Sequence, residues 1–418
     1  MVGLPCLWSQ VRRSKKSCAL LSVTPGRFHA VALPHVYHTI NERHLKRASL
    51  SYALARHPHY ATFVRAVKWE LLTLESQIKP HSNQLARSVA LLSRFSALQH
   101  LSLLSANCLP DFASPATDQM EALQLPQLEC ITISIENSLL PWQIGIWKLL
   151  HFFGGFNGMR RLEFDNCCDF VDFPATSPAW PTIRSITINS PNSDPQSDSS
   201  IGRLLAKCSS LETLTFSYDL DPYGLSGFFE DCLHAGSVRQ QLIRLHVGGL
   251  RVDPEVPAMP AIGHALPLLQ HLSLSFDHIE EEAVTPLFKT WTALFPASQS
   301  CHSLTTLALS CSDAFQTLFG YEELSYKTFA FLTSSPFPAL RRFSFICYKD
   351  EEAYIAYSPD GSEESSRSAD DDYKADLERL VASAPAGLEV TYGYREGSVG
   401  RIKAFVGSRG QEIEVRYW

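Results

Sequence analysis

The chain of 418 residues lacks the short motifs on which most catalytic and metal sites are built. It has no C-x-x-C pair, no H-E-x-x-H and no G-x-S-x-G, and the glycine-rich run at 154–158 is not followed by the Lys-Ser/Thr of a phosphate loop. The pairs His35/His38 and His57/His59 have no cysteine or carboxylate beside them. We therefore predict a chain that is not an enzyme and that uses no cofactor and no metal.

Signs of secretion are also missing. The 11 cysteines are odd in number and scattered, and no N-x-[ST] site occurs, which favours reduced thiols and a cytoplasmic or nuclear location. At the N-terminus, basic residues follow the apolar ones rather than precede them, unlike a signal peptide. The most apolar stretch, Asn137–Phe156, contains Pro141 and Lys148, so we interpret it as a buried helix and expect no membrane partner.

The chain has little charge, and that charge is unevenly distributed. Only 19% of residues are charged, and the net charge is −7. Residues 350–372 hold nine acidic side chains and one arginine, which leaves about +1 for the rest of the chain. The folded part therefore lacks the positive field that phosphate binding requires, and we expect no nucleic-acid partner.

What the chain does have is a short apolar template, Φ-x-x-L-x-x-Φ-x-Φ, repeated along its length. The second positions of nine clear copies are separated by 24 to 36 residues, and a degenerate earlier copy involves Val64, Val67 and Trp69. Those second positions are Leu98, Leu128, Met159, Ile183, Leu211, Leu242, Leu269, Leu304 and Leu340. Spacing in this range is typical of repeat proteins.

Each copy has a direct physical interpretation. The final Φ-x-Φ alternates with period two and predicts a short strand with one buried face. Helices are predicted at Ser82–Phe95, Ile201–Cys208, Glu281–Phe295, Ser325–Ser334 and Tyr373–Ala384. One such unit cannot bury its own apolar face, so the copies must stack side by side.

These copies resemble the leucine-rich-repeat family in an irregular form over residues 60–348. The L-x-x-L-x-L pattern is present, whereas the Asn or Cys expected three positions after the last Leu occurs only at Cys167. The resemblance implies an α/β fold: a leucine-rich-repeat-like curved solenoid with a parallel sheet on the concave face and helices on the convex face.

The strand positions that alternate with the buried ones predict the residues of a concave binding face. Of 27 such positions, 13 are Ser or Thr and five are charged, which suits an extended peptide or a loop of a partner protein; Ser and Thr are also simply common on exposed strands. The residues we predict to contact the partner are His100, Ser102, Thr132, Arg161, Glu163, Asp165, Thr187, Thr215, Arg244, His246, His271, Ser273 and Arg342.

Residues 18–40 resemble the C-terminal half of an F-box as found in fungal F-box/repeat proteins. The matching residues include Leu20, Leu21, Val23, Phe28, Leu33, Pro34 and Tyr37. The resemblance implies docking on the Skp-type adaptor of cullin–RING ubiquitin ligases, with the repeats selecting the substrate. The opening Leu-Pro-x-Glu and its helix are missing, and Pro25-Gly26 interrupts the helix that should carry Phe28, so the segment is partial; it could alternatively cap the end of the repeats.

The sequence thus predicts four parts. Residues 1–50 form the partial F-box-like segment or cap, residues 51–348 the repeat array, residues 349–372 an acidic disordered insertion, and residues 373–418 a helix and a β-hairpin around Gly407–Gly410 that cover the last repeat. The predicted function is substrate recognition for a ubiquitin ligase. The alternative is a repeat scaffold that binds a protein partner and has no link to ubiquitin.

Overall fold

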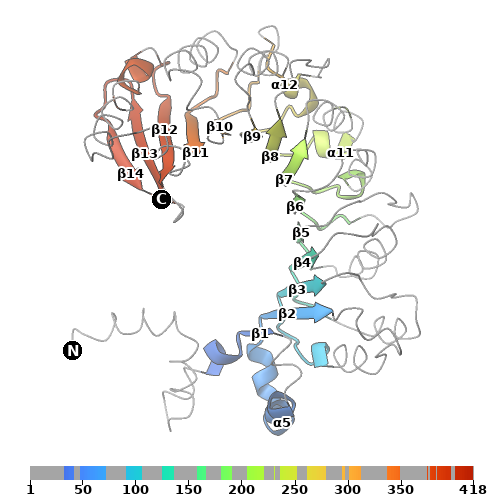
Figure 1. Ribbon diagram of the computed structural model, residues 1–418. Coiled ribbons are helices and arrows are strands. Elements are labelled where there is room, and N and C mark those ends of the chain that lie inside the picture. The colour runs from blue at the N-terminus through green and yellow to red at the C-terminus, as the bar shows by residue number, and fades with distance from the viewer. Residues whose placement is uncertain are drawn as a thin grey trace, which may run out of the picture. The chain divides into compact units, whose positions relative to one another are not determined.

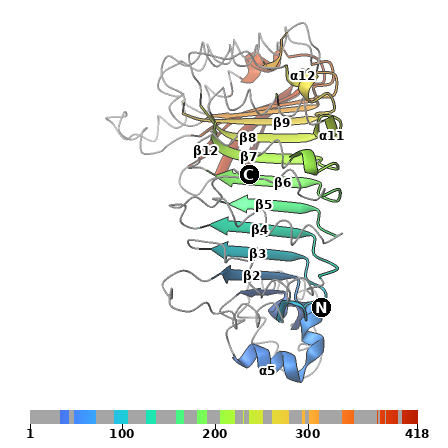
Figure 2. The same cartoon turned by 90° about the vertical axis from the view of Figure 1, so that its right-hand side faces the viewer.

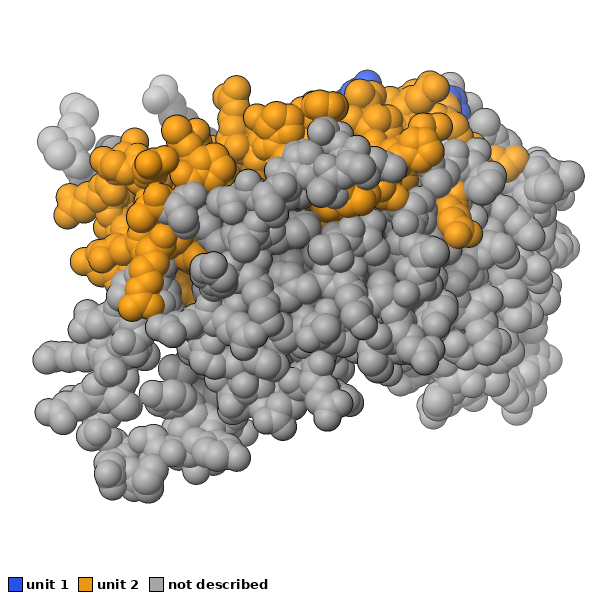
Figure 3. All heavy atoms as spheres, turned by 90° about the horizontal axis from the view of Figure 1, so that it is seen from above, with its two compact units in different colours: residues 1–189 blue, residues 190–418 orange. Residues whose placement is uncertain are grey.

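The protein is described from a computed structural model. The structure describes residues 33–41, 48–71, 91–105, 125–135, 158–165, 180–190, 205–220, 230, 236–251, 261–278, 294–296, 301–311, 337–348, 374, 377–382, 384–396 and 401–417. The chain forms two compact units, residues 1–189 and residues 190–418, which Figure 3 shows in different colours. Each unit is considered by itself.

Unit 1 is built on parallel strands that follow one another in chain order. Each neighbouring pair from β1 to β6 is parallel. Figure 2 shows β2 to β5 as stacked arrows that point the same way. The strands are β1 (Thr39–Asn41), β2 (Ala66–Leu71), β3 (His100–Ser105), β4 (Cys130–Ile135), β5 (Arg161–Asp165) and β6 (Ser185–Ser190).

Unit 2 continues the same plan and ends differently. Parallel pairing joins neighbours from β7 to β12, after which β12 pairs with β13, and β13 with β14, in antiparallel fashion (Figure 1). The strands are β7 (Thr213–Leu220), β8 (Arg244–Arg251), β9 (His271–His278), β10 (Thr306–Cys311), β11 (Arg342–Tyr348), β12 (Glu389–Glu396), β13 (Arg401–Ser408) and β14 (Glu414–Tyr417).

The register aligns the apolar template from strand to strand. Leu101 lies opposite Ile131, and Ile131 opposite Leu162; in unit 2, Leu272 lies opposite Leu307. All 18 residues at the two strand positions of the nine copies are buried, none more than 5% exposed. A fully buried Leu or Ile contributes about 1.5–3 kcal/mol, so these columns form the core that holds each unit together. The predicted strands and their buried face are confirmed.

A repeated hydrogen-bond pattern leads the chain into each strand. The N–H of Leu98 donates to the carbonyl of Phe95 at 3.0 Å, which closes a turn between the first two template positions. The N–H groups of Glu129 and Cys130 then both donate to the carbonyl of Gln99 in the preceding repeat, at 2.9 and 3.0 Å. A carbonyl oxygen can accept both because it has two lone pairs, and the arrangement fixes the register at the start of the strand.

Helices are few among the described residues. The assigned ones are α5 (Ala48–Arg56), α11 (Gly236–Arg239), α12 (Ile262–Ala265) and the 3₁₀ helix η1 (Pro58–Phe63). Within the helices predicted from the sequence, residues 91–92, 205–207 and 377–382 are described and helical. The predicted helix at 325–334 and the acidic segment 349–372 lie outside the described residues. The fold is therefore α/β and dominated by a long, mostly parallel sheet.

Both ends of the strand series differ from the expectation. The sequence did not predict β1 or β12, each of which adds a parallel strand next to the predicted ones. The two strands of the predicted C-terminal hairpin are present as β13 and β14, and Gly410, with φ of +81°, occupies the turn between them. No helix within the described residues is long and apolar enough to cross a bilayer, and the apolar stretch 137–156 lies outside those residues.

Candidate functional site

The strand residues that alternate with the buried columns form one side of the sheet in each unit, which we call the polar face. It consists of the first, third and fifth residues of β3 to β6 and of β7 to β11. Of these 27 residues, 22 are partly exposed. Only Arg161, Arg244 and Arg342 are exposed, and only Cys130 and Gly248 are buried. Every residue predicted for the partner-binding face lies on it.

In unit 1 the polar face carries a chain of hydrogen bonds across three neighbouring strands. A ring nitrogen of His100, Nε2, lies 2.8 Å from Oγ1 of Thr132, and that hydroxyl donates to Oε2 of Glu163 at 2.7 Å. Because a threonine hydroxyl has one hydrogen and a carboxylate only accepts, Nε2 of His100 must be the donor to Thr132. Beside this chain, the hydroxyl of Ser134 lies 3.4 Å from Oδ2 of Asp165.

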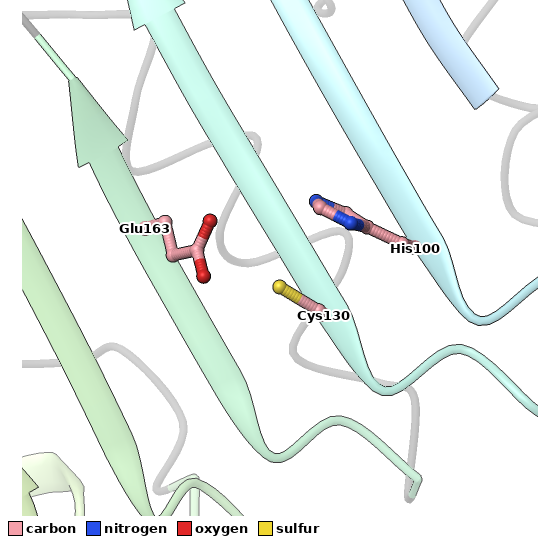
Figure 4. Close-up of side chains that lie close together, drawn as sticks. All are labelled: His100, Cys130 and Glu163. Atoms are coloured by element: carbon pink, nitrogen blue, oxygen red, sulfur yellow. The ribbon is translucent and has the colours of Figure 1, made fainter. Parts of the chain in front are cut away.

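Cys130 lies within the same cluster. It is 1% exposed, and it is the first residue of β4, where it lies opposite His100 of β3. The ligand atoms of His100, Cys130 and Glu163 all lie within 4.8 Å of one another. Figure 4 shows the three side chains on one side of the sheet, pointing toward each other from β3, β4 and β5. We call these three residues the His–Cys–Glu cluster.

Burial and the neighbouring charges set the protonation of this cluster. Burial lowers the pKa of His100 below its ordinary value; Glu163 opposes that change, while Arg161 and Lys68 add to it. Burial, helped by the charge of Glu163 and opposed by that of Arg161, raises the pKa of the Cys130 thiol to about 11. At neutral pH the His100 ring is thus uncharged, and the Cys130 sulfur keeps its proton as long as no metal ion binds to it.

In unit 2 the same face is cationic and carries no carboxylate at the matching positions. His271 lies in register between Arg244 and Thr306, and Thr306 pairs in turn with Arg342. Burial lowers the pKa of His271, and the charges of Arg244 and Arg342 lower it further. Burial likewise lowers the pKa of His246. This surface suits an acidic or hydrogen-bonding segment better than a cation.

Of the F-box-like residues, only Leu33, Pro34 and Tyr37 are described, in a helical turn at 33–37; Leu20, Leu21, Val23 and Phe28 lie outside the described residues. Leu33 is 8% exposed. The ring of Tyr37 lies 5.1 Å from that of Tyr60 in η1, and Tyr60 stacks on His57 at 4.9 Å. Leu33 is therefore buried, and Tyr37 contacts η1 at the start of the repeats.

The sequence placed His100, Thr132, Glu163 and Asp165 on one face but did not connect them, and Cys130 was not among the predicted site residues. Motif searches look for ligands a few residues apart, whereas these are separated by whole repeats. The sequence signal that could have connected them is the template register, because residues one repeat apart at the same template position become neighbours.

No protein-family model matches this chain, and no curated protein matches it either.

Proposed function

We propose that this chain is a leucine-rich-repeat-like protein that holds a partner protein on its polar face and serves as the substrate-recognition subunit of a cullin–RING ubiquitin ligase. The observation that carries the proposal of partner binding is the register of the first and third polar-face residues, which continues from β3 to β6 in unit 1 and from β7 to β11 in unit 2. Thr132, Glu163 and Thr187 form one such row. A surface of this kind offers a regular series of donors and acceptors to an extended segment or a loop.

The exposed arginines indicate which partner residues would bind in unit 2. Arg244 and Arg342 are the exposed residues of the polar face in unit 2, and both lie near His271. Guanidinium groups bind carboxylates in a bidentate fashion, so a partner segment with Asp or Glu at matching intervals is favoured.

A photo-crosslinking experiment tests the use of the polar face. A crosslinking amino acid at Thr215, on the polar face of β7, should capture the partner in cells, whereas one at exposed Glu412, in the turn before β14, should not. With the partner purified, Arg244→Glu should weaken binding at least tenfold, and Arg409→Glu, the same charge change in an exposed turn, should leave it unchanged. Equal capture from both positions, or equal weakening by both substitutions, would contradict this use of the face.

The link to ubiquitin depends on the F-box-like segment. The full chain, mixed with purified Skp-type adaptor, should form a complex that Leu20→Asp and Phe28→Asp abolish. The same two variants should still bind the partner through the repeats. If the adaptor does not bind, the ligase role is wrong while partner binding stands.

The alternative is a scaffold with no link to ubiquitin, and one observation favours it. Leu33 is buried, and Tyr37 packs against Tyr60 of η1, so at least one F-box-like residue takes part in the start of the repeats. A segment that mainly completes the first repeats would tolerate Leu20→Asp and lose stability on Tyr37→Ala. Comparing adaptor binding and thermal unfolding of these two variants separates the two functions.

A further inference from the structure

We propose that His100, Cys130 and Glu163 form a binding site for a divalent transition-metal ion, with zinc as the preferred ion. The proposal is independent of partner binding and of the ubiquitin link. It rests on three ligand-bearing side chains of different types that three neighbouring strands place on one side of the sheet, all within 4.8 Å of one another (Figure 4).

The ligand types select the ion. Zn²⁺ takes imidazole nitrogen at about 2.0–2.1 Å, thiolate sulfur at about 2.3 Å and carboxylate oxygen at about 2.0–2.2 Å, in a tetrahedral arrangement. A mixed nitrogen, sulfur and oxygen set suits zinc better than Mg²⁺ or Ca²⁺, which prefer oxygen alone. Three protein ligands leave a fourth position, which water can occupy.

The surroundings already orient two of the ligands. Thr132 accepts a hydrogen bond from Nε2 of His100 and donates one to Oε2 of Glu163, as metal-ligating side chains are commonly held by neighbouring polar groups. In this tautomer the free lone pair is on Nδ1, which can bind the ion directly; binding through Nε2 requires its proton to move to Nδ1 and the contact with Thr132 to be given up. Cys130 also contacts Thr132 and Glu163 through hydrogen bonds, so its sulfur lies next to the Glu163 carboxylate.

Binding requires one exchange at Cys130. The ion forms a bond to sulfur, the S–H bond breaks, and the proton leaves to solvent. Arg161, in register beside Cys130, and Lys68 place positive charge near the site and therefore weaken cation binding. Removing the charge of Arg161 or of Lys68 should therefore strengthen metal binding.

Cobalt titration of the full chain is the direct test, because Co²⁺ replaces Zn²⁺ and a cobalt–thiolate bond gives an intense charge-transfer band in the near ultraviolet. We expect one equivalent of Co²⁺ to produce the band and Zn²⁺ to remove it. Cys130→Ser should abolish the band, whereas Cys301→Ser, which removes a buried thiol in unit 2, should keep it. Absence of the band in the unaltered chain, or its persistence in Cys130→Ser, would overturn the proposal.

Substitutions that keep the size of the side chain show whether a loss of metal binding comes from the lost ligand rather than from misfolding. Glu163→Gln and His100→Gln should weaken Co²⁺ binding by at least about tenfold, since changes even in outer-shell partners cost that much. Arg161→Gln should tighten it. A band unchanged by Glu163→Gln and by Arg161→Gln would mean that cobalt binds Cys130 outside this cluster, which also contradicts the proposal.

Unit 2 allows a test of sufficiency. His271, Thr306 and Ser344 occupy on β9, β10 and β11 the positions that His100, Cys130 and Glu163 occupy on β3, β4 and β5. The variant Thr306→Cys, Ala308→Thr, Ser344→Glu should bind a second equivalent of Co²⁺ with a second thiolate band. Failure to do so, with the protein folded, would show that this register is not enough to build the site.

Discussion

The polar faces of unit 1 and unit 2 share a backbone plan and differ in chemistry. Burial lowers the pKa of both His100 and His271. In unit 1, Glu163 opposes this lowering while Arg161 and Lys68 add to it; in unit 2, Arg244 and Arg342 add to it and no carboxylate of the described residues opposes it. The register is the same in both places. The comparison teaches that the template fixes where side chains stand, and that the choice of residue at each position decides whether a face attracts a cation or an anion.

The largest expected effects concern what the two units have in common. Leu162→Ala in unit 1 and Leu272→Ala in unit 2 should each lower the free energy of unfolding by about 2–5 kcal/mol, because each side chain is 1% exposed and the surroundings of a deleted core side chain relax only partly into the cavity. Urea unfolding measures this, with Thr187→Ala on the polar face as the control at under about 0.5 kcal/mol. If Leu162→Ala costs no more than the control, the buried column of unit 1 is not a packed core.

The next effect should separate the two polar faces. Thr132→Val removes the hydroxyl that joins His100 to Glu163, and it should cost about 1–3 kcal/mol because two polar groups lose their partner. Thr215→Val, at the matching position of β7, should be neutral or slightly stabilising, since no side-chain hydrogen bond of Thr215 occurs within the described residues and Val favours strands. Thermal unfolding of both variants decides this. Equal losses would mean that the hydrogen-bond chain adds nothing in unit 1.

The sequence predicts the strands of the repeats well because their signal is local. A strand is indicated by apolar and polar residues that alternate over a few positions. The turn before it is indicated by one apolar residue, usually leucine, three positions before the first buried strand residue. That distance fails at β12, where Leu388 precedes Val390 by two positions instead of three and Gly387, with φ of +84°, takes up the difference. The short strand β1 has no template leucine at all, so it was missed as well.

The candidate site could be predicted only in part, because its groups are distant in sequence. His100 and Glu163 could be placed on one face from their template positions alone. Their hydrogen bonds through Thr132, and the burial of Cys130 between them, depend on the pairing of neighbouring strands and on side-chain conformations. Neither follows from periodicity.

A pH titration sharpens the comparison further. Burial lowers the pKa of His246 in unit 2 below 6.5, so the unfolded chain binds a proton more readily than the folded one. The stabilisation is therefore complete above pH 6.5 and is lost as the pH falls through the lower, folded pKa. His246→Gln should flatten the decline in unfolding free energy between about pH 7 and pH 5. A steeper decline in the variant would mean that the sign of the shift is wrong.

The smallest effect is expected where unit 2 does bring opposite charges together. Arg342 Nε lies 3.6 Å from Glu389 Oε1, with the two side chains 72% and 37% exposed. Water and salt screen such a pair, so Glu389→Gln should change the unfolding free energy by less than about 1 kcal/mol. The same substitution should strengthen binding of an acidic partner segment, because it frees the guanidinium of Arg342. Measuring both quantities on one variant tests whether the exposed arginines of unit 2 serve recognition: a stability loss of several kcal/mol, with no gain in affinity, would assign Arg342 to the fold instead.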